Sequence, residues 1–477
     1  MKYLRRCAKV LGWLILLMVG LVAVYLTALI YANWNDDALS DASVAALQFT
    51  PPTEDALSDN GYLILMGLDA PVQNDAIGDA VALGRLRLER EIERRRWIET
   101  HGGQAEGMPS VISSPETSED GLPPRLSCPK HATDCFEWYA KHQTEIQALI
   151  QKNDALLQRV LAAGTARQFK NPGPVYLLVD LPPFGRLIRA HELWLAQASL
   201  VWMQGQPQQA VNMARQAAQL RKRLASNSDS LIVSMIALAM QYRELRWLSH
   251  AVKRMEPKAR WTASKDIEEI LSTPQVSLQQ ALEGEKEFIA ITFYSLETPE
   301  LLPTPYKDGA DWWATLLNKA SRLAFLPQQT LNISIQNLQE VQAISTLPAH
   351  NAKAAFDNAS QRWDRDYACT PWTRLRNVLG ICIANLAPPF YLDYLQRVTD
   401  VEGYRRLVVL QHRAKIEQIA LAVMPAWLTQ STQELHNPYT LQPMQWDAAT
   451  NSLVFEGRER QNQNPDQSSI YRIRLDD

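Results

Sequence analysis

Three glutamates lie close together in a segment that is predicted to be a helix. They are Glu283, Glu285 and Glu287, and bulky apolar or aromatic side chains follow them within residues 289–294. A carboxyl group held in an apolar groove has a raised pKa, and it can then donate a proton to the oxygen of a glycosidic bond. The pattern therefore indicates candidate general acids for glycan cleavage, although acidic residues on a solvent-exposed helix face give the same spacing.

Aromatic and arginine side chains are concentrated between residues 363 and 374. Tryptophan, tyrosine and arginine contribute much of the binding energy at protein interfaces. The segment is therefore a candidate partner-binding surface. An alternative is that its aromatic rings pack around a disulfide while its aspartates and arginines pair with each other. The candidate residues are Trp363, Arg365, Tyr367, Trp372 and Arg374.

The sequence contains none of the short motifs that accompany common catalytic or cofactor sites. It has no H-E-x-x-H, P-loop, G-x-S-x-G or G-x-G-x-x-G sequence, and its eight histidines are scattered. No cofactor and no metal site is therefore predicted. The formal net charge of -3 gives no electrostatic reason to expect nucleic acid as a partner. These observations favour a non-catalytic binding or scaffold protein.

Four of the five cysteines follow the apolar segment near the N-terminus, and Cys7 precedes it. An even number of cysteines in an oxidising compartment predicts disulfides. The short separations favour pairing of Cys128 with Cys135 and of Cys369 with Cys382, although four cysteines allow three connectivities.

Zinc binding is an alternative for the first cysteine pair. His131 and His142 lie close to Cys128 and Cys135 in the sequence, and two cysteines with two histidines can form a tetrahedral zinc site. The spacing matches no zinc module, and an oxidising compartment disfavours free thiolates. A disulfide is therefore the favoured interpretation.

Residues 11–30 contain no charged side chain and are long enough to span a bilayer as a helix. About 20 helical residues cross the hydrocarbon layer, which is roughly 30 Å thick. By the positive-inside rule, the flanking charges place residues 1–10 in the cytoplasm and the chain after Trp34 outside. The flanking residues are Lys2, Arg5, Arg6 and Lys9 before the segment and Asp36, Asp37 and Asp41 after it.

The favoured interpretation is an uncleaved, single-pass anchor in the inner membrane with a periplasmic body. A cleavable signal peptide is the alternative, but its apolar core would normally be about 7–15 residues long, and no A-x-A site follows this segment. The expected partners are therefore the lipid bilayer, through residues 11–30, and an envelope protein.

The rest of the sequence predicts a mostly α-helical body with a small C-terminal β-hairpin. Leu453 and Phe455, like Tyr471 and Ile473, alternate with polar residues, which is typical of strands. The predicted organisation is a cytoplasmic stub at 1–10, a transmembrane helix at 11–30, a membrane-proximal region with a flexible loop at 35–127, a helical domain at 128–296, a second helical segment at 308–436 and the β-hairpin at 437–477.

Within the first helical domain, residues 191–224 have the spacing of a tetratricopeptide-type helical hairpin. No second copy follows at a step of about 34 residues, so a single hairpin inside a larger helical body is predicted. The matching aromatic, small and turn residues are Trp194, Ala198, Gly205, Ala210 and Ala217.

Further helices are predicted at 80–98 and near the end of the second helical segment. The charged residues of 80–98 are spaced for i,i+4 pairs, which favours a solvated helix face, with lipid-headgroup contact as the alternative. Near the end of the second helical segment, separate helices are predicted at 389–401 and 403–422.

Several short segments resemble a set of uncharacterised single-pass proteobacterial envelope proteins. They are the N-terminal anchor and residues 60–71, 376–380 and 437–458. The resemblance implies an envelope location and carries no activity with it. We therefore expect a membrane-anchored periplasmic binding or scaffold protein. The alternative is a membrane-tethered enzyme that processes cell-wall glycan with a glutamate general acid.

Overall fold

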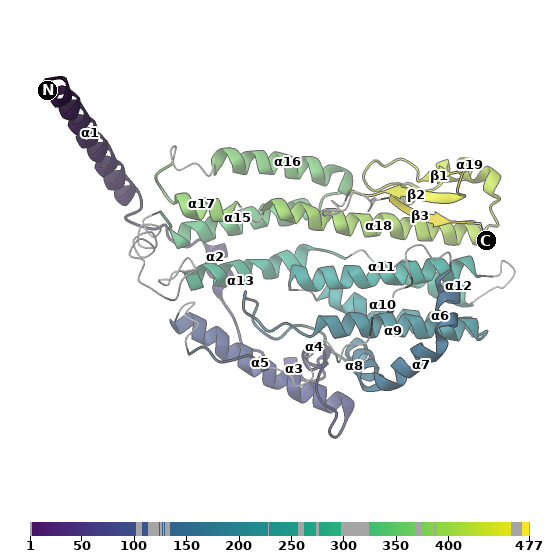
Figure 1. Ribbon diagram of the computed structural model, residues 1–477. Coiled ribbons are helices and arrows are strands. Elements are labelled where there is room, and N and C mark those ends of the chain that lie inside the picture. The colour runs from purple at the N-terminus through teal and green to yellow at the C-terminus, as the bar shows by residue number, and fades with distance from the viewer. Residues whose placement is uncertain are drawn as a thin grey trace.

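The computed structural model is mostly helical, with one small antiparallel sheet close to the C-terminus (Figure 1). Long helices lie side by side in the body, and one further helix projects from one end of it. The structure describes residues 2–101, 107–112, 124, 126, 128, 134–227, 229–255, 262–272, 276–296, 324–367, 374–385, 388–458 and 470–476.

The helices and strands have the following bounds. The helices of the first half are α1 (Lys2–Ala32), α2 (Asp41–Leu47), α3 (Glu54–Leu57), α4 (Gly61–Met66), α5 (Ala76–His101), α6 (Cys135–Lys141), α7 (Gln143–Lys152), α8 (Asp154–Thr165), α9 (Phe184–Met203), α10 (Pro207–Ser226) and α11 (Leu231–Lys253). They are followed by α12 (Thr262–Leu271), α13 (Gln279–Leu296), α15 (Pro327–Ser345), α16 (Ala349–Asp366), α17 (Val378–Ala384), α18 (Pro388–Ile416), η2 (Leu421–Val423), α19 (Met424–Thr429), η3 (Gln433–Leu435), β1 (Gln445–Asp447), β2 (Ser452–Glu456) and β3 (Ile470–Arg474).

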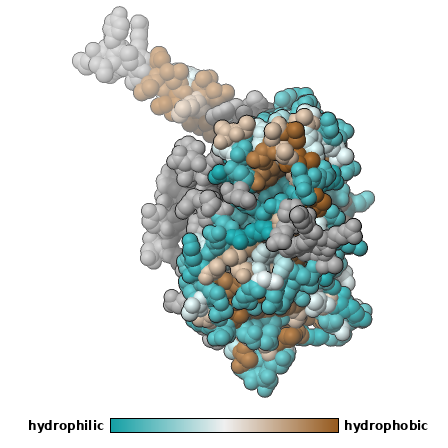
Figure 2. All heavy atoms as spheres, turned by 90° about the vertical axis from the view of Figure 1, so that its right-hand side faces the viewer, coloured by the Kyte–Doolittle hydropathy of each residue, from teal (hydrophilic) through white to brown (hydrophobic). Residues whose placement is uncertain are grey.

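Helix α1 contains the apolar segment and stands clear of the body. Residues Lys9–Ala32 are long and apolar enough to cross a membrane, and Leu29 is the one residue of this stretch that is buried. Figure 2 shows the hydrophobic surface of α1 beyond a body whose visible face is mostly hydrophilic. The helix predicted at 11–30 is thus confirmed as a helix of spanning length, a property that a signal sequence shares.

The predicted helical hairpin at 191–224 is confirmed as α9 and α10. Gly205 adopts a positive φ of 81°, which glycine tolerates at no steric cost, and Pro207 begins α10. The Nε1 of Trp194 donates to the carbonyl oxygen of Met213 at 2.9 Å. Ala198 and Ala210 are fully buried, because small side chains allow the two helices to approach closely.

Helices α11 and α18 run side by side in the same direction. Gln411 donates to the carbonyl oxygen of Ser249 at 3.1 Å, and Lys415 donates to that of Lys253 at 3.0 Å. The prediction of two helices separated at Gly403 is wrong, because α18 is continuous through this residue. Gly403 instead makes room for the sheet, since a Cβ there would lie 2.3 Å from the ring of Phe455.

The C-terminal sheet contains the two predicted strands and one more. β2 pairs with β3 in the antiparallel register Phe455↔Tyr471 and Leu453↔Ile473. β1 adds a third strand on the other edge of β2, where Trp446 pairs with Leu453. A strand of three residues is too short to show the alternation of apolar and polar residues on which the prediction relied.

The prediction that the charged residues of α5 form a solvated face is correct for only part of them, such as the exposed Glu89, Glu93 and Arg96. Arg87, Glu91, Arg94 and Arg95 are all buried. Arg87 donates to both carboxylate oxygens of Asp69 at 2.7 and 2.9 Å, so the ionic partner of this arginine lies outside its own helix. The i,i+4 spacing did not reveal these long-range partners.

The disulfide between Cys128 and Cys135 is confirmed, with sulfur atoms 2.04 Å apart. The zinc alternative therefore loses its two thiolates, which are bonded to each other, and His131 lies outside the described residues. Cys382 is also disulfide-bonded. Cys369 lies outside the described residues, so its pairing with Cys382 stays a prediction, as do the predicted domain limits.

Candidate functional site

A cavity of about 250 Å³ lies where α4, α11, α13 and α18 meet the segment of residues 171–182, which contains no helix or strand. Its walls are mostly apolar, yet four carboxyl groups line it. Burial raises the pKa of all four carboxyl groups. We call this site the acidic cavity. Its carboxyl groups belong to Glu91, Asp180, Asp229 and Glu285, and its apolar wall includes Met66, Val233 and Phe288.

Close backbone packing of α4 forms one side of the acidic cavity. A Cβ on Gly61 would lie 2.3 Å from the carbonyl oxygen of Ala163, and a Cβ on Gly84 would lie 2.0 Å from that of Leu63. Only glycine permits this approach of α8 and α5 to α4. The apolar stretch 62–66 is consequently buried on every side.

Buried arginine and acid side chains of α5 hold the 171–182 segment in place. Arg94 donates through Nη2 to the carbonyl oxygen of Leu178 at 2.7 Å and through Nε to the hydroxyl of Tyr176 at 3.2 Å. The same hydroxyl donates to the carboxylate of Glu91. Segments without regular structure must satisfy their buried backbone groups elsewhere, and α5 supplies partners for this one.

Gly284 brings the carboxyl groups of Asp229 and Glu285 together. A Cβ at this position would lie 1.7 Å from the carbonyl oxygen of Asp229, so α13 directly touches the backbone that leads into α11. The neighbouring Glu285 accepts a hydrogen bond from the backbone N–H of Leu231 at 3.0 Å. The glycine between two glutamates thus allows Glu285 to lie beside Asp229.

Asp229 and Glu285 both differ from ordinary surface acids in their pKa. Burial raises the pKa of Asp229 to about 6, against a hydrogen bond from the side chain of Asn171. Burial raises the pKa of Glu285, and the nearby Asp229 raises it further. In the part of the chain that the structure describes, neither side chain forms an ion pair. Glu91 differs, since its carboxylate lies 3.6 Å from Arg94.

The other two predicted glutamates have different environments. Glu287 accepts from the backbone N–H of Val175 at 3.2 Å, and burial raises its pKa to about 7. Glu283 is mostly exposed and accepts from Lys286 and Gln342, hydrogen bonds that outweigh partial burial and lower its pKa. Of the three candidates, the structure therefore places only Glu285 in the lining of the acidic cavity.

The predicted partner-binding residues do not form one exposed aromatic surface. Trp363 is buried and donates from Nε1 to Glu340 at 2.9 Å. Arg365 is exposed and pairs with Asp366, whose carbonyl oxygen also accepts from Arg374. Tyr367 is half-buried and packs against the core, and Trp372 lies outside the described residues. Pairing of arginine with aspartate, the alternative interpretation, is thus observed in this segment.

Sequence reasoning missed Asp229, Asp180 and Glu91, which come from three separate parts of the chain. Nothing local marks them, since each becomes part of the site only through long-range packing. The one available signal was Gly284, because an isolated glycine inside a helical pattern often marks a close approach.

In the described part of the chain, no group of three His, Cys, Asp or Glu side chains is arranged to hold a metal ion. Comparison with known protein families, with curated proteins and with solved structures gives no match to this chain.

Proposed function

We propose that this protein is an inner-membrane-anchored periplasmic binding protein and that the acidic cavity is its ligand site. The observation that carries the proposal is the presence of Asp229 and Glu285 side by side, without ion pairs among the described residues, in a cavity with mostly apolar walls. The ligand that fits this chemistry is an amphiphilic amine, with an apolar body and a cationic head.

The cost of burying these carboxylates supports the choice of ligand. A buried charge without a partner destabilises the folded state, and proteins that keep such groups commonly do so at functional sites. A cationic head placed between Asp229 and Glu285 would supply the missing opposite charge. The apolar wall, which includes Met66, Val233 and Phe288, would contact the rest of the ligand.

The location part of the proposal is supported by the charge asymmetry around α1. Basic residues precede the apolar stretch and acidic residues follow it, which orients a single-pass helix with its N-terminus in the cytoplasm. Fusion of a periplasm-dependent phosphatase after Asp477 tests this orientation. We expect an active fusion, and an inactive fusion that is expressed normally would overturn the orientation.

Binding is tested by calorimetry on the full chain in lipid nanodiscs, with octylamine as the probe and octanol as its uncharged counterpart. We expect octylamine to bind, and Glu285→Gln and Asp229→Asn each to weaken it by about tenfold, or about 1.4 kcal/mol. Glu283→Gln is the matched control, since Glu283 is on the same helix but faces outward. Equal affinity for octylamine and octanol, or equal binding by all variants, would overturn the proposal.

A glycan-processing enzyme is the second candidate, because Glu285 and a second carboxyl group do line a common cavity. The apolar wall favours binding of an amphiphile over binding of a hydroxyl-rich sugar. Incubation of the wild-type protein with purified cell-wall glycan, with Glu285→Gln as the comparison, decides between the two. Release of fragments by the wild type alone would support the enzyme.

A further inference from the structure

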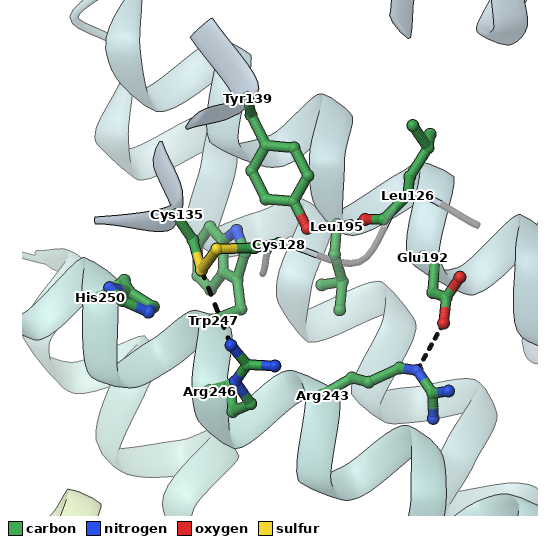
Figure 3. A pocket seen from close by; sticks show the side chains of 10 residues that line it. All are labelled: Leu126, Cys128, Cys135, Tyr139, Glu192, Leu195, Arg243, Arg246, Trp247 and His250. Carbon is green, nitrogen blue, oxygen red and sulfur yellow. Dashed lines mark hydrogen bonds and ion pairs between the residues drawn. A yellow bond between two sulfur atoms is a disulfide. The ribbon is translucent and has the colours of Figure 1, made fainter. Parts of the chain in front are cut away.

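A disulfide lines a second, separate cavity in the helical body. This cavity has a volume of about 50 Å³ and is partly open to solvent. Figure 3 shows the Cys128–Cys135 disulfide at its edge, with side chains of α9 and α11 around it. The sulfur atoms therefore lie next to a space that a small group can enter, although each cysteine residue is only 5% exposed.

A guanidinium group points at one of the two sulfur atoms. The Nη2 of Arg246 lies 3.9 Å from the Sγ of Cys135, and this contact is drawn in Figure 3. Arg243, one turn earlier on α11, is instead neutralised by Glu192 at 2.8 Å. Among the described residues, no carboxylate forms an ion pair with Arg246, so its charge is directed to the sulfur.

The other titratable side chains of this cavity do not compete with Arg246 as cations. His250 lies one turn further along α11, and burial lowers its pKa to about 4, so it is neutral near pH 7. The hydroxyl of Tyr139 donates to the carbonyl oxygen of Leu126 at 3.0 Å and is fully engaged. Arg246 is therefore the cation that acts on the disulfide.

We infer that Cys128–Cys135 is a redox-active disulfide and that Arg246 stabilises Cys135 as the leaving thiolate. A thiolate is the attacking and the leaving species in thiol–disulfide exchange, and a nearby arginine favours it over the thiol. Attack on the sulfur of Cys128 is thus preferred, because the electron pair of the broken bond then goes to the sulfur beside the guanidinium. The co-reactant is a dithiol.

The exchange balances in two steps. One thiolate of the dithiol bonds to the Sγ of Cys128, and the S–S bond breaks to release Cys135 as a thiolate. The second thiolate of the dithiol then attacks the dithiol sulfur that is bonded to Cys128, and Cys128 leaves as a thiolate. The dithiol loses two electrons and becomes a disulfide, the two cysteines are reduced, and the two thiol protons pass to solvent or to the cysteines.

Reduction of the folded, full-length protein by dithiothreitol tests the inference, with alkylation and mass analysis as the readout. We expect Arg246→Gln to slow reduction by about tenfold and Arg246→Lys to retain most of the rate. Lys222→Gln is the control, since it removes an exposed charge of α10 that does not line this cavity, and it should leave the rate unchanged. A disulfide that is reduced only on unfolding, or equal rates in Arg246→Gln and the wild type, would overturn the inference.

A second measurement does not depend on whether Arg246→Gln folds. In Cys128→Ser, the pH dependence of alkylation by iodoacetamide, followed by mass analysis on the peptide that contains Cys135, reports the pKa of the remaining Cys135 thiol. We expect this pKa to lie at least about one unit below the ordinary value of about 8.5. A Cys135 pKa at or above that ordinary value would contradict the assigned role of Arg246.

Discussion

Arg376 and Asp37, which are 339 positions apart in the sequence, form an ion pair of 2.6 Å that joins the base of α1 to the body. Arg376 also donates to the carbonyl oxygen of Ala32 at 2.8 Å. Beside it, the backbone N–H of Asn377 donates to the side chain of Asn33 at 2.7 Å. The projecting helix is therefore attached by several long-range hydrogen bonds in addition to the chain itself.

Replacement of Arg376 by alanine should loosen this attachment. We expect protection from hydrogen exchange at residues 33–40 to fall by about tenfold, because the loss of a half-exposed hydrogen-bonded pair costs on the order of 1 kcal/mol. Arg374→Ala is the control, since Arg374 donates to the carbonyl oxygen of Asp366 at the end of α16. Unchanged protection in Arg376→Ala would show that the Arg376 side chain does not contribute to this attachment.

Asp229→Asn should stabilise the ligand-free protein near neutral pH. The folded-state pKa of Asp229 is raised to about 6, so the folded state holds this proton more tightly than the unfolded chain does. The stability that this group contributes is therefore fully present below roughly pH 4 and is lost as the pH rises through about 6.

Thermal unfolding at two pH values measures this effect. We expect Asp229→Asn to gain about 2 kcal/mol near pH 7.5 and almost nothing near pH 4, where the wild-type carboxyl group is already protonated. The expected gain comes together with the loss of octylamine binding proposed above. Destabilisation by the substitution at both pH values would contradict the raised pKa.

The buried pair of Arg87 and Asp69 should be costly to break. Arg87→Met leaves the carboxylate of Asp69 buried without its partner, and we expect a loss of about 3–5 kcal/mol in urea unfolding. Arg85→Met, also on α5, removes an exposed pair with Glu54 of α3 and should cost less than about 1 kcal/mol. Similar losses in the two variants would mean that the α5 face is solvated after all.

Two glycines in long helices should respond to alanine in opposite directions. Gly403→Ala places a methyl group against the ring of Phe455 and should destabilise the protein by about 1–3 kcal/mol. Gly185→Ala meets no atom within 4 Å and should stabilise by up to about 1 kcal/mol, the gain in helix propensity. Shortening Phe455 to leucine should recover part of the loss at Gly403, and the absence of any recovery would argue against this contact.

The sequence patterns that predicted the fold correctly are local ones. The apolar run at 11–30, the small residues of the 191–224 hairpin and the alternation around Leu453 each depend on neighbours within one or two turns or strands. The short separation of Cys128 and Cys135 belongs to the same class. Interactions between residues that are close in the sequence can be predicted without knowledge of the tertiary structure.

The acidic cavity was predictable only in part, because its residues interact over long separations in the sequence. Glu285 was a candidate for its chemistry, but its environment depends on Asp229 and on the 171–182 segment. The buried part of the charged face of α5 was misjudged for the same reason, since Arg87 finds Asp69 rather than a partner on its own helix. Separate helices were predicted at 389–401 and 403–422 because a sequence does not show whether a glycine such as Gly403 interrupts a helix or accommodates an aromatic ring within it.

The parallel helices α11 and α18 determine how far the body extends from α1. Helix α18 has 29 residues, so it extends roughly 44 Å from the end near the base of α1 towards the C-terminal sheet. The sheet therefore lies towards the opposite end of the body from α1 (Figure 1). The acidic cavity, which Tyr394 lines near the start of α18, is thus separated from the sheet along this helix.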